Sequence, residues 1–300
     1  MYKLILDLPA WMSEVEVALI GEALADLSVA QSAMRADNNH QADWSLQWFL
    51  EERIDDAQVH SRVSVALYAH DIQLDDFSFR YEQVEQDVNW LEECYRQFPP
   101  FSVGPFFIYG SHFQEGVPEG QMGLQIDAAT AFGSGEHGTT KGCLQAMLEL
   151  KAAGHCPWNI LDMGTGSGIL AIAAWKLWEA PVLAVDNDEE AVRVTDKHRD
   201  INGVPSGAGQ MLSAYGDGFK TDIVKDKKPY ELVIANILAS ALVEMTDELV
   251  DVMDEKGFVI LSGILNEQAQ KVIKVYETAG LKLYKTYVVG DWTSLVMQKP

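Results

Sequence analysis

The sequence has few cysteines, no long apolar run and little positive charge, and each shortage excludes a class of protein. The three cysteines, Cys94, Cys143 and Cys156, form no Cys-x-x-Cys pair and no even set, so we expect reduced thiols rather than a disulfide framework. No apolar stretch approaches the length of a membrane span. Asp7 and Pro9 interrupt the first apolar residues before the core of a signal peptide could form. These absences predict a cytoplasmic protein without membrane contact.

Basic residues are outnumbered two to one, with 22 Lys and Arg against 45 Asp and Glu and a net charge of −23. A protein that binds a phosphate backbone needs a basic face, so we expect no direct nucleic-acid binding. The acidity suits a basic protein partner or simply a solvated surface, and both interpretations stay open. The 48% hydrophobic content is ordinary for a globular chain, and 300 residues suffice for one large domain or two ordinary ones. We expect a monomer.

Residues 1–85 alternate between short strands and helices and are predicted to form a first domain. Ser13 with Glu16 three residues later has the spacing of a capping box at a helix start. The order of elements is typical of a small α+β domain of ferredoxin-like type. The predicted strands are 2–8, 28–35, 43–50 and 76–84, and the predicted helices are 13–27 and 55–69.

Residues 86–110 are crowded with aromatic side chains around two proline-containing pairs, Pro99-Pro100 and Gly104-Pro105. Such a segment is too aromatic for a flexible linker, and we expect it to pack between two domains. Residues 111–300 form the predicted second domain. From Pro157 onward it alternates strand and helix, which is the pattern of a mostly parallel α/β sheet, and it ends in a predicted hairpin. The strands are 159–163, 182–186, 210–215, 231–237, 258–263, 283–289 and 294–298, and the helices are 168–178, 188–202, 240–254 and 267–279.

A glycine-rich turn joins the first of these strands to its helix, with Gly164, Gly166 and Gly168 behind Asp162. A dinucleotide fingerprint would need glycine at 169, where the chain has Ile, so the spacing favours S-adenosylmethionine (SAM) over a nicotinamide cofactor. Asp186 ends the next strand, where a carboxylate can hold the two ribose hydroxyls. A tight strand-to-helix turn without a ligand is the alternative, and the two aspartates favour ligand binding.

Two further elements follow later strands of the sheet. Asn236 and Ile237 close the fourth strand, at the carboxyl edge where open α/β sheets bind ligands, and an Asn carbonyl there can accept a hydrogen bond from an amine. Capping of the helix from Ser240 is the alternative role of Asn236. Asp217, after the third strand, either meets an adenine amino group or is an ordinary turn residue.

A stretch of small residues from Asp127 to Thr140 precedes a helix that is predicted to start near Thr139. Thr139 and Thr140 at a helix start can offer a hydroxyl and backbone N–H groups to the carboxylate of the methionine part of SAM. His137 is a candidate base, although a lone loop histidine is more often structural. The other histidines lack metal-ligand spacing, so we expect no metal site.

Taken together, these segments resemble the PrmA-type ribosomal protein methyltransferases, which act on the large-subunit stalk-base protein L11. The resemblance implies a Rossmann-like, seven-stranded SAM-dependent methyltransferase domain preceded by a small domain that recognises the protein substrate. It implies SAM contacts at Thr140, Gly164, Asp186 and Asn236, and methylation of lysine side chains and an N-terminal amine. The matching pieces are Trp90 with Phe98-Pro99, Ala131-Phe132-Gly133-Ser134-Gly135 with His137 and Thr139-Thr140, residues 162–170, Asp186, and residues 235–239.

The chain departs from the family where Asp127-Ala128-Ala129 replaces the usual Asp-Pro-Gly and Gly133-Ser134-Gly135 replaces Gly-Thr-Gly, which changes the permitted backbone angles. In the predicted mechanism, Asn236 and the carbonyl of Ile237 orient the amine while water accepts its proton. Three alternatives stay open: a methyltransferase for another protein or a small molecule, a SAM-binding module without catalysis, and a nicotinamide dehydrogenase, against which Ile169 argues.

Overall fold

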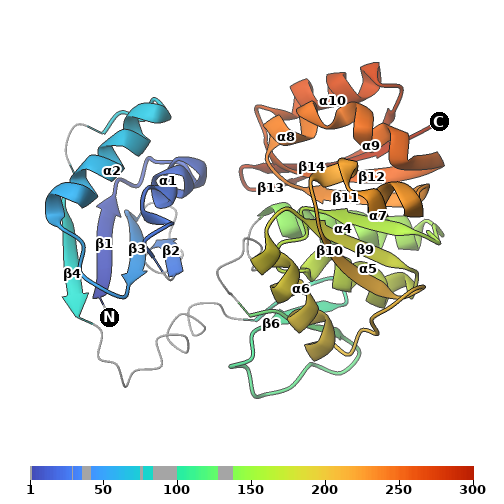
Figure 1. Cartoon of the computed structure of the whole chain (residues 1–300), viewed down its shortest axis with the longest axis horizontal. Coiled ribbons are helices and arrows are strands. Elements are labelled where there is room, and N and C mark those ends of the chain that lie inside the picture. The colour runs from blue at the N-terminus through green and yellow to red at the C-terminus, as the bar shows by residue number, and fades with distance from the viewer. Residues whose placement is uncertain (1, 29, 36–41, 75–76, 84–99, 128–137) are drawn as a thin grey trace. The chain divides into compact units, whose positions relative to one another are not determined.

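The computed structural model describes residues 2–28, 30–35, 42–74, 77–83, 100–127 and 138–300 (Figure 1). The chain divides into two compact units, Met1–Cys94 and Tyr95–Pro300. Each unit has a hydrophobic core of its own. Among the described residues, no helix combines the length and the apolar character that crossing a bilayer requires.

The described residues of the first unit form a four-stranded antiparallel sheet in the order β2-β3-β1-β4 with helices α1 and α2 (Figure 1). Alternate residues of the central strands, such as Leu4, Leu6 and Trp48, pack with Val17 and Val63 of the helices. This arrangement confirms the predicted ferredoxin-like α+β fold. Its elements are β1 (Tyr2–Leu8), α1 (Glu14–Gly21), the 3₁₀ turn η1 (Glu22–Leu24), β2 (Ala30–Arg35), β3 (Trp44–Leu50), α2 (Asp56–Ala69) and β4 (Phe79–Gln83).

The start of α1 is the predicted capping box, because the N–H of Glu16 donates to Ser13 Oγ at 3.2 Å and the Ser13 N–H donates to the Glu16 carboxylate at 2.8 Å. The helix is shorter than the predicted 13–27. The indole N–H of buried Trp48 donates to the Gly21 carbonyl at 2.9 Å. Because that carbonyl is already bonded, the chain tightens into η1, where Ala25 donates to Glu22 instead.

The second unit is built on a seven-stranded sheet in the order β10-β9-β8-β11-β12-β14-β13, in which only β14 runs antiparallel to its neighbours. This order confirms the predicted seven-stranded Rossmann-like sheet with its terminal hairpin. The strands are β8 (Ile160–Met163), β9 (Val182–Asp186), β10 (Met211–Tyr215), β11 (Tyr230–Asn236), β12 (Met253–Leu265), β13 (Lys282–Val289) and β14 (Trp292–Gln298).

Helices cover both faces of this sheet (Figure 1). Ile160, Ala184 and Ile234 belong to a core shared with α4 and α5, whereas Leu161 and Val233, each in the alternate position of its strand, belong to a core shared with α7 to α10. The strands are therefore buried on both sides, which explains their continuous apolar runs. The helices are α4 (Gly138–Ala152), α5 (Ile169–Trp178), α6 (Glu189–Ile201), α7 (Asp222–Lys227), α8 (Ala239–Glu244), α9 (Thr246–Val252) and α10 (Ala269–Thr278), with a 3₁₀ turn η3 (Gly218–Lys220).

Two features of this unit differ from the predictions. The predicted helix 240–254 is two helices, α8 and α9, because the Thr246 hydroxyl donates to the carbonyls of Leu242 and Val243 at 3.0 Å and the chain turns at Met245. The short helix α7 was not predicted, since six residues carry too little periodicity.

Part of the predicted interdomain segment 86–110 belongs to the second unit. Its residues up to 99 lie outside the described residues, but Phe101–Val103 and Phe106–Tyr109 form strands β5 and β6 of a small sheet completed by β7 (Met122–Gln125). Phe106, Ile108 and Leu124 are buried against α4 and α5. The aromatic content of residues 101–109 therefore reflects a core position inside one unit.

Close packing of α4 on β14 sets the position of the helix start. A Cβ at Gly142 would overlap the Ser294 side chain, whose hydroxyl lies 2.7 Å from that of Ser262. The Ser262 hydroxyl in turn donates to the carbonyl of Thr139 at 3.1 Å. Glycine at 142 thus allows the helix to approach the sheet and brings Thr139 to the end of β12.

We expect Gly142→Ala to lower the free energy of unfolding by about 1–3 kcal/mol, because the added methyl group has no room beside Ser294. Chemical denaturation measures this change. Gln145→Ala, on the exposed side of the same helix, is the matched control and should shift the stability by no more than about 0.5 kcal/mol. Equal stability of Gly142→Ala and the wild type would show that α4 is not seated this closely.

Candidate functional site

The candidate site lies at the carboxyl edge of the seven-stranded sheet. The parallel strands β9, β8 and β11 are neighbours, with Met163 paired to Val185 on one side and to Ala235 on the other. Their ends therefore bring the glycine turn, Asp186 and Asn236 to the same edge. The chain winds from β8 toward β9 and β10 and then returns to β11, so the site is at the topological switch point where such sheets bind ligands.

The glycine turn adopts left-handed backbone angles, with φ of 71° at Gly164, 55° at Gly166 and 80° at Gly168. The Gly164 N–H donates to the Val185 carbonyl at 2.8 Å, which fixes the turn to the end of β9. A Cβ at 164 would overlap the Cγ2 atom of Ile237. The turn after β8 and the segment after β11 are thus in direct contact, and residue 164 must be glycine for both reasons.

The Asp186 carboxylate orders the backbone around it. Its Oδ2 accepts from the Gly166 N–H at 2.8 Å and its Oδ1 from the Asp188 N–H at 3.1 Å. Asp188 caps α6 by accepting from the Glu190 N–H at 2.9 Å. Asp186 is partly exposed, so each carboxylate oxygen can accept a further hydrogen bond from a ligand hydroxyl.

Asp162 lies beneath the turn rather than at its surface, with 1% of the residue exposed. The Thr165 hydroxyl donates to its Oδ2 at 2.7 Å. Burial raises the pKa of this carboxyl to about 7, and the nearby charge of Asp186 acts in the same direction. Asp162 therefore supports the turn from beneath, and its direct contact with a cofactor stays a prediction.

Thr139 and Thr140 lie in the first turn of α4, as predicted. Thr140 is 1% exposed, and its hydroxyl has no hydrogen-bond partner among the described residues. A buried hydroxyl without a partner costs about 1–3 kcal/mol, which a ligand acceptor would offset. Residues at a helix start also present free N–H groups and a partial positive charge, which suits a carboxylate.

Asn236 is the last residue of β11, and its side chain makes no hydrogen bond to another described residue. It does not cap the following helix, since Leu238 occupies the cap position of α8. The residue is partly exposed at the edge. The carbonyl oxygen of Ile237 packs against Gly263, where a Cβ would overlap it. The structure thus favours the site role of Asn236 over its capping role.

Asp217 is exposed in the turn between β10 and η3. The preceding Gly216 donates its N–H to the Asp186 carbonyl at 2.9 Å, so this turn lies beside the end of β9 at the site edge. The Asp217 side chain does not cap η3. Its contact with an adenine amino group stays a prediction.

Sequence inspection missed two contributors. Gly263 provides the space for the carbonyl of Ile237. Its position as a glycine at the end of the predicted strand 258–263 could have indicated this role. His198 is 1% exposed and bonds to Ser167 inside the glycine turn. No sequence pattern indicated this role, because His198 lies in a predicted helix and has no metal-ligand spacing to other residues. The predicted loop elements Ala128 to His137 lie outside the described residues.

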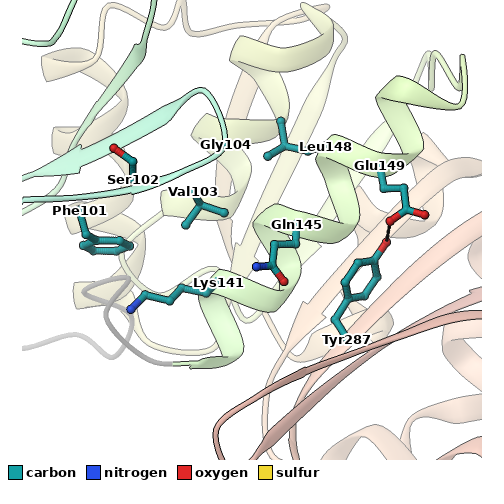
Figure 2. A pocket seen from close by; sticks show the side chains of 9 residues that line it. All are labelled: Phe101, Ser102, Val103, Gly104, Lys141, Gln145, Leu148, Glu149 and Tyr287. Carbon is teal, nitrogen blue, oxygen red and sulfur yellow. Dashed lines mark hydrogen bonds between the residues drawn. The ribbon is translucent and has the colours of Figure 1, made fainter.

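A separate cavity of about 690 Å³ opens beside α4, between β5 and β13. Figure 2 shows Phe101 and Lys141 on one side and the Glu149–Tyr287 hydrogen bond, 2.8 Å long, on the other. The Lys141 ammonium lies 4.8 Å from the Phe101 ring centre. None of the predicted site residues lines this cavity, so it is distinct from the edge at β8 and β11.

Comparison with known proteins gives consistent matches. The family model for ribosomal protein L11 methyltransferases (PrmA) matches residues 16–300. The ribosomal protein L11 methyltransferase of Rhizobium meliloti (strain 1021) is 43% identical over 213 residues, covering 71% of this chain and 72% of that protein. The one from Sinorhizobium fredii (strain NBRC 101917 / NGR234) is 40% identical over 247 residues, covering 82% and 81%.

One solved structure matches with a TM-score of 0.57 at 30% identity, over 68% of this chain and 100% of that chain. It is the crystal structure of a ribosomal protein L11 methylase from Lactobacillus delbrueckii subsp. bulgaricus. The family and the fold imply SAM as the methyl donor. The residues at the sheet edge fit such a molecule. The buried Thr140 hydroxyl has no partner among the described residues, the start of α4 suits a carboxylate, and the Asp186 carboxylate is partly exposed.

We expect Gly164→Ala to weaken SAM binding by about tenfold or more, because the methyl group overlaps Ile237 and opposes the left-handed backbone. Isothermal titration calorimetry measures the affinity. Gly209→Ala is the matched control, since Gly209 has φ of 81° but nothing within 4 Å of an added Cβ. Gly209→Ala has a similar conformational cost at a left-handed backbone position, and it should bind SAM like the wild type. Equal affinity of Gly164→Ala would contradict the contact with Ile237.

Asp162→Asn should change how stability depends on pH. The folded pKa of about 7 exceeds the ordinary value of 3.8, so between these values the folded state holds a proton that the unfolded chain has released. Wild-type stability therefore falls as pH rises through this window, by up to about 1.4 kcal/mol per pH unit. The Asn variant lacks this fall.

The measurement is the thermal midpoint of both proteins from about pH 5 to pH 8.5, which spans the upper part of this window. The thermal midpoint of Asp162→Asn should rise progressively relative to that of the wild type as pH rises. Gln145→Ala, at an exposed position of α4, removes no titratable group and should differ from the wild type by the same amount at every pH. If the thermal midpoints of Asp162→Asn and the wild type differed by the same amount at every pH, the buried carboxyl would not titrate in this range.

Proposed function

Because the chain belongs to the ribosomal protein L11 methyltransferase (PrmA) family, we propose that it transfers methyl groups from SAM to amines of ribosomal protein L11. The observation that carries the proposal is the contact between Gly164 and Ile237. It supports a position of Asn236 beside the glycine turn, and the Asn236 side chain makes no hydrogen bond to another described residue. A cofactor held by the turn would thus have its reactive end next to Asn236.

The chain's own residues account for each end of the cofactor. Asp186 would accept hydrogen bonds from the two ribose hydroxyls, and Asp217 would meet the adenine amino group. Thr139 and Thr140 would hold the methionine carboxylate with a backbone N–H and the free hydroxyl. Gly164, Gly166 and Gly168 let the backbone approach the ligand, while Asp162 holds the turn from below.

When bound, SAM supplies an electrophilic methyl carbon on a positively charged sulfur. A neutral amine that attacked this carbon would form the new C–N bond as the C–S bond broke, and the extra proton of the nitrogen would leave to water. A lysine amine has a reference pKa of about 10.4, so it must lose a proton before attack, and desolvation at the site favours that loss. Asn236 would accept a hydrogen bond from the amine N–H and direct its lone pair at the methyl group.

Asn236 and the Ile237 carbonyl are too weakly basic to remove the proton, so their contribution is orientation. The Ile237 oxygen faces Gly263, which restricts where an amine can reach it, and Asn236 is the stronger candidate for this role. Lysine side chains and an N-terminal α-amine are the proposed acceptors. The first domain of the predicted division, residues 1–85, is proposed to recognise the protein, and the reaction would take place in the cytoplasm.

Intact-mass spectrometry of purified L11 incubated with the protein and SAM tests this function. We expect mass increases in whole methyl units that disappear when SAM is left out, and peptide mapping should place them on lysine and N-terminal amines. Binding of SAM without any mass increase would favour another protein or small molecule as substrate, or a module that binds SAM without catalysis.

Asn236→Ala should reduce kcat by about 100-fold with SAM saturating, because the amine loses its orienting acceptor. Asn236→Asp keeps an oxygen at the same position and should retain more activity than the alanine variant. Ser240→Ala, at an exposed position of α8, is the control for changes near the site and should be fully active. Full activity of Asn236→Ala would remove the proposed role.

A further inference from the structure

His198 on α6 connects two parts of the second unit through its ring. Nδ1 lies 2.8 Å from the carbonyl oxygen of Ser167, and Nε2 lies 3.2 Å from the backbone nitrogen of Asp127. A backbone N–H can only donate and a carbonyl can only accept. The ring is therefore neutral, with its hydrogen on Nδ1 and an unprotonated Nε2 that accepts from Asp127.

The two partners of His198 belong to different elements. Ser167 lies between Gly166 and Gly168 in the glycine turn. Asp127 follows β7, is 6% exposed, and immediately precedes residues 128–137 in the sequence. The Asp127 carboxylate accepts from the Ser111 N–H at 2.7 Å and lies 3.7 Å from the Lys197 ammonium. Its backbone is thus fixed at a defined point beside α6.

Neighbouring residues of α6 reinforce both connections. Thr195, one turn earlier, donates its hydroxyl to the Gly166 carbonyl at 3.1 Å. Asn202, one turn later, accepts from the Gln125 N–H at 2.9 Å and donates to the Gln125 carbonyl at 2.8 Å. Thr195 therefore holds the glycine turn and Asn202 holds β7, while His198 between them bonds to both.

We propose that His198 is a positioning residue that couples the glycine turn to Asp127, so that a ligand bound at the turn orders the end of β7. The coupling rests on the proposed function, in which SAM occupies the turn. Movement of the Ser167 carbonyl is transmitted through one rigid ring to the Asp127 N–H. His198 itself touches neither cofactor nor substrate in this role.

The coupling depends on the protonation state of the ring. A second proton would place an N–H at Nε2 against the Asp127 N–H, and the hydrogen bond would be lost. Burial lowers the pKa of His198 below its usual value of 6.5. The charged groups that face the ring are Asp127 after β7 and Lys197 on α6, whereas the glycine turn presents only a carbonyl. The link is intact above pH 6.5 and weakens as pH falls through the lowered pKa.

Two variants separate the two bonds of the ring. The amide of Asn is placed near the position of Nδ1, so His198→Asn keeps the bond to Ser167 and loses the one to Asp127. The amide of Gln reaches the position of Nε2, so His198→Gln keeps an acceptor for Asp127 and loses the bond to the turn. Neither amide titrates.

The experiment measures SAM affinity by calorimetry, and hydrogen exchange of the peptide Met122–Asp127 with and without SAM, in the full-length protein. In the wild type, SAM should slow exchange of this peptide by about fivefold or more. His198→Asn should bind SAM within about threefold of the wild type, yet show less than about twofold slowing. His198→Gln should bind SAM about tenfold more weakly, because it loses the bond to the turn, and at saturating SAM it should also show less than about twofold slowing.

If SAM slowed exchange in His198→Asn as much as in the wild type, the coupling would be overturned. Binding of SAM to the wild type without any slowing of exchange would overturn it as well. If His198→Asn does not fold, His198→Gln decides: slowing of exchange by saturating SAM to the wild-type extent in this variant would also overturn the proposal. Failure of the wild type to bind SAM at all would instead refute the proposed function, and this outcome is recognised before any variant is compared.

Discussion

Parallel pairing of β8 with β11 at the centre of the sheet is the constraint on which the site depends. The pairing juxtaposes two turns that are far apart in the sequence, and the missing side chain at Gly164 lets them touch at Ile237. Both strands are buried on two faces, so their register is held by the packing of two separate cores. Small changes at the edge are therefore resisted by much of the hydrophobic interior of the second unit.

Electrostatics at this edge is organised by two carboxylates in different surroundings. Asp162 is buried beneath the turn, and its raised pKa reflects the loss of water around it. Asp186 is partly exposed and bonds to two backbone N–H groups. The buried group supports the turn and the exposed one remains able to bind. A positively charged sulfonium would find negative potential here, in a chain that carries a net charge of −23.

Local chemistry made much of this architecture predictable. The alternation of strand and helix predicted the parallel sheet, and Ser13 with Glu16 predicted the start of α1. The glycine spacing located the turn, and Asn236 and the two threonines were found at the same edge. Predictions failed where tertiary contacts decide: Trp48 ends α1, Thr246 divides a predicted helix, and core burial turns residues 101–109 into strands. His198 was missed for the same reason, since both of its partners are distant backbone groups.

Helix α6 extends from its cap Asp188, beside the end of β9, to its cap Asn202, beside β7, and it carries Thr195 and His198 between them. Each residue added to an α-helix lengthens it by about 1.5 Å and rotates the later residues by about 100°. An insertion or deletion between Asp188 and His198 would thus turn the imidazole away from Ser167 and Asp127 together. The contacts at the two ends of α6 therefore constrain the length of the helix more strongly than the sequence of its exposed side.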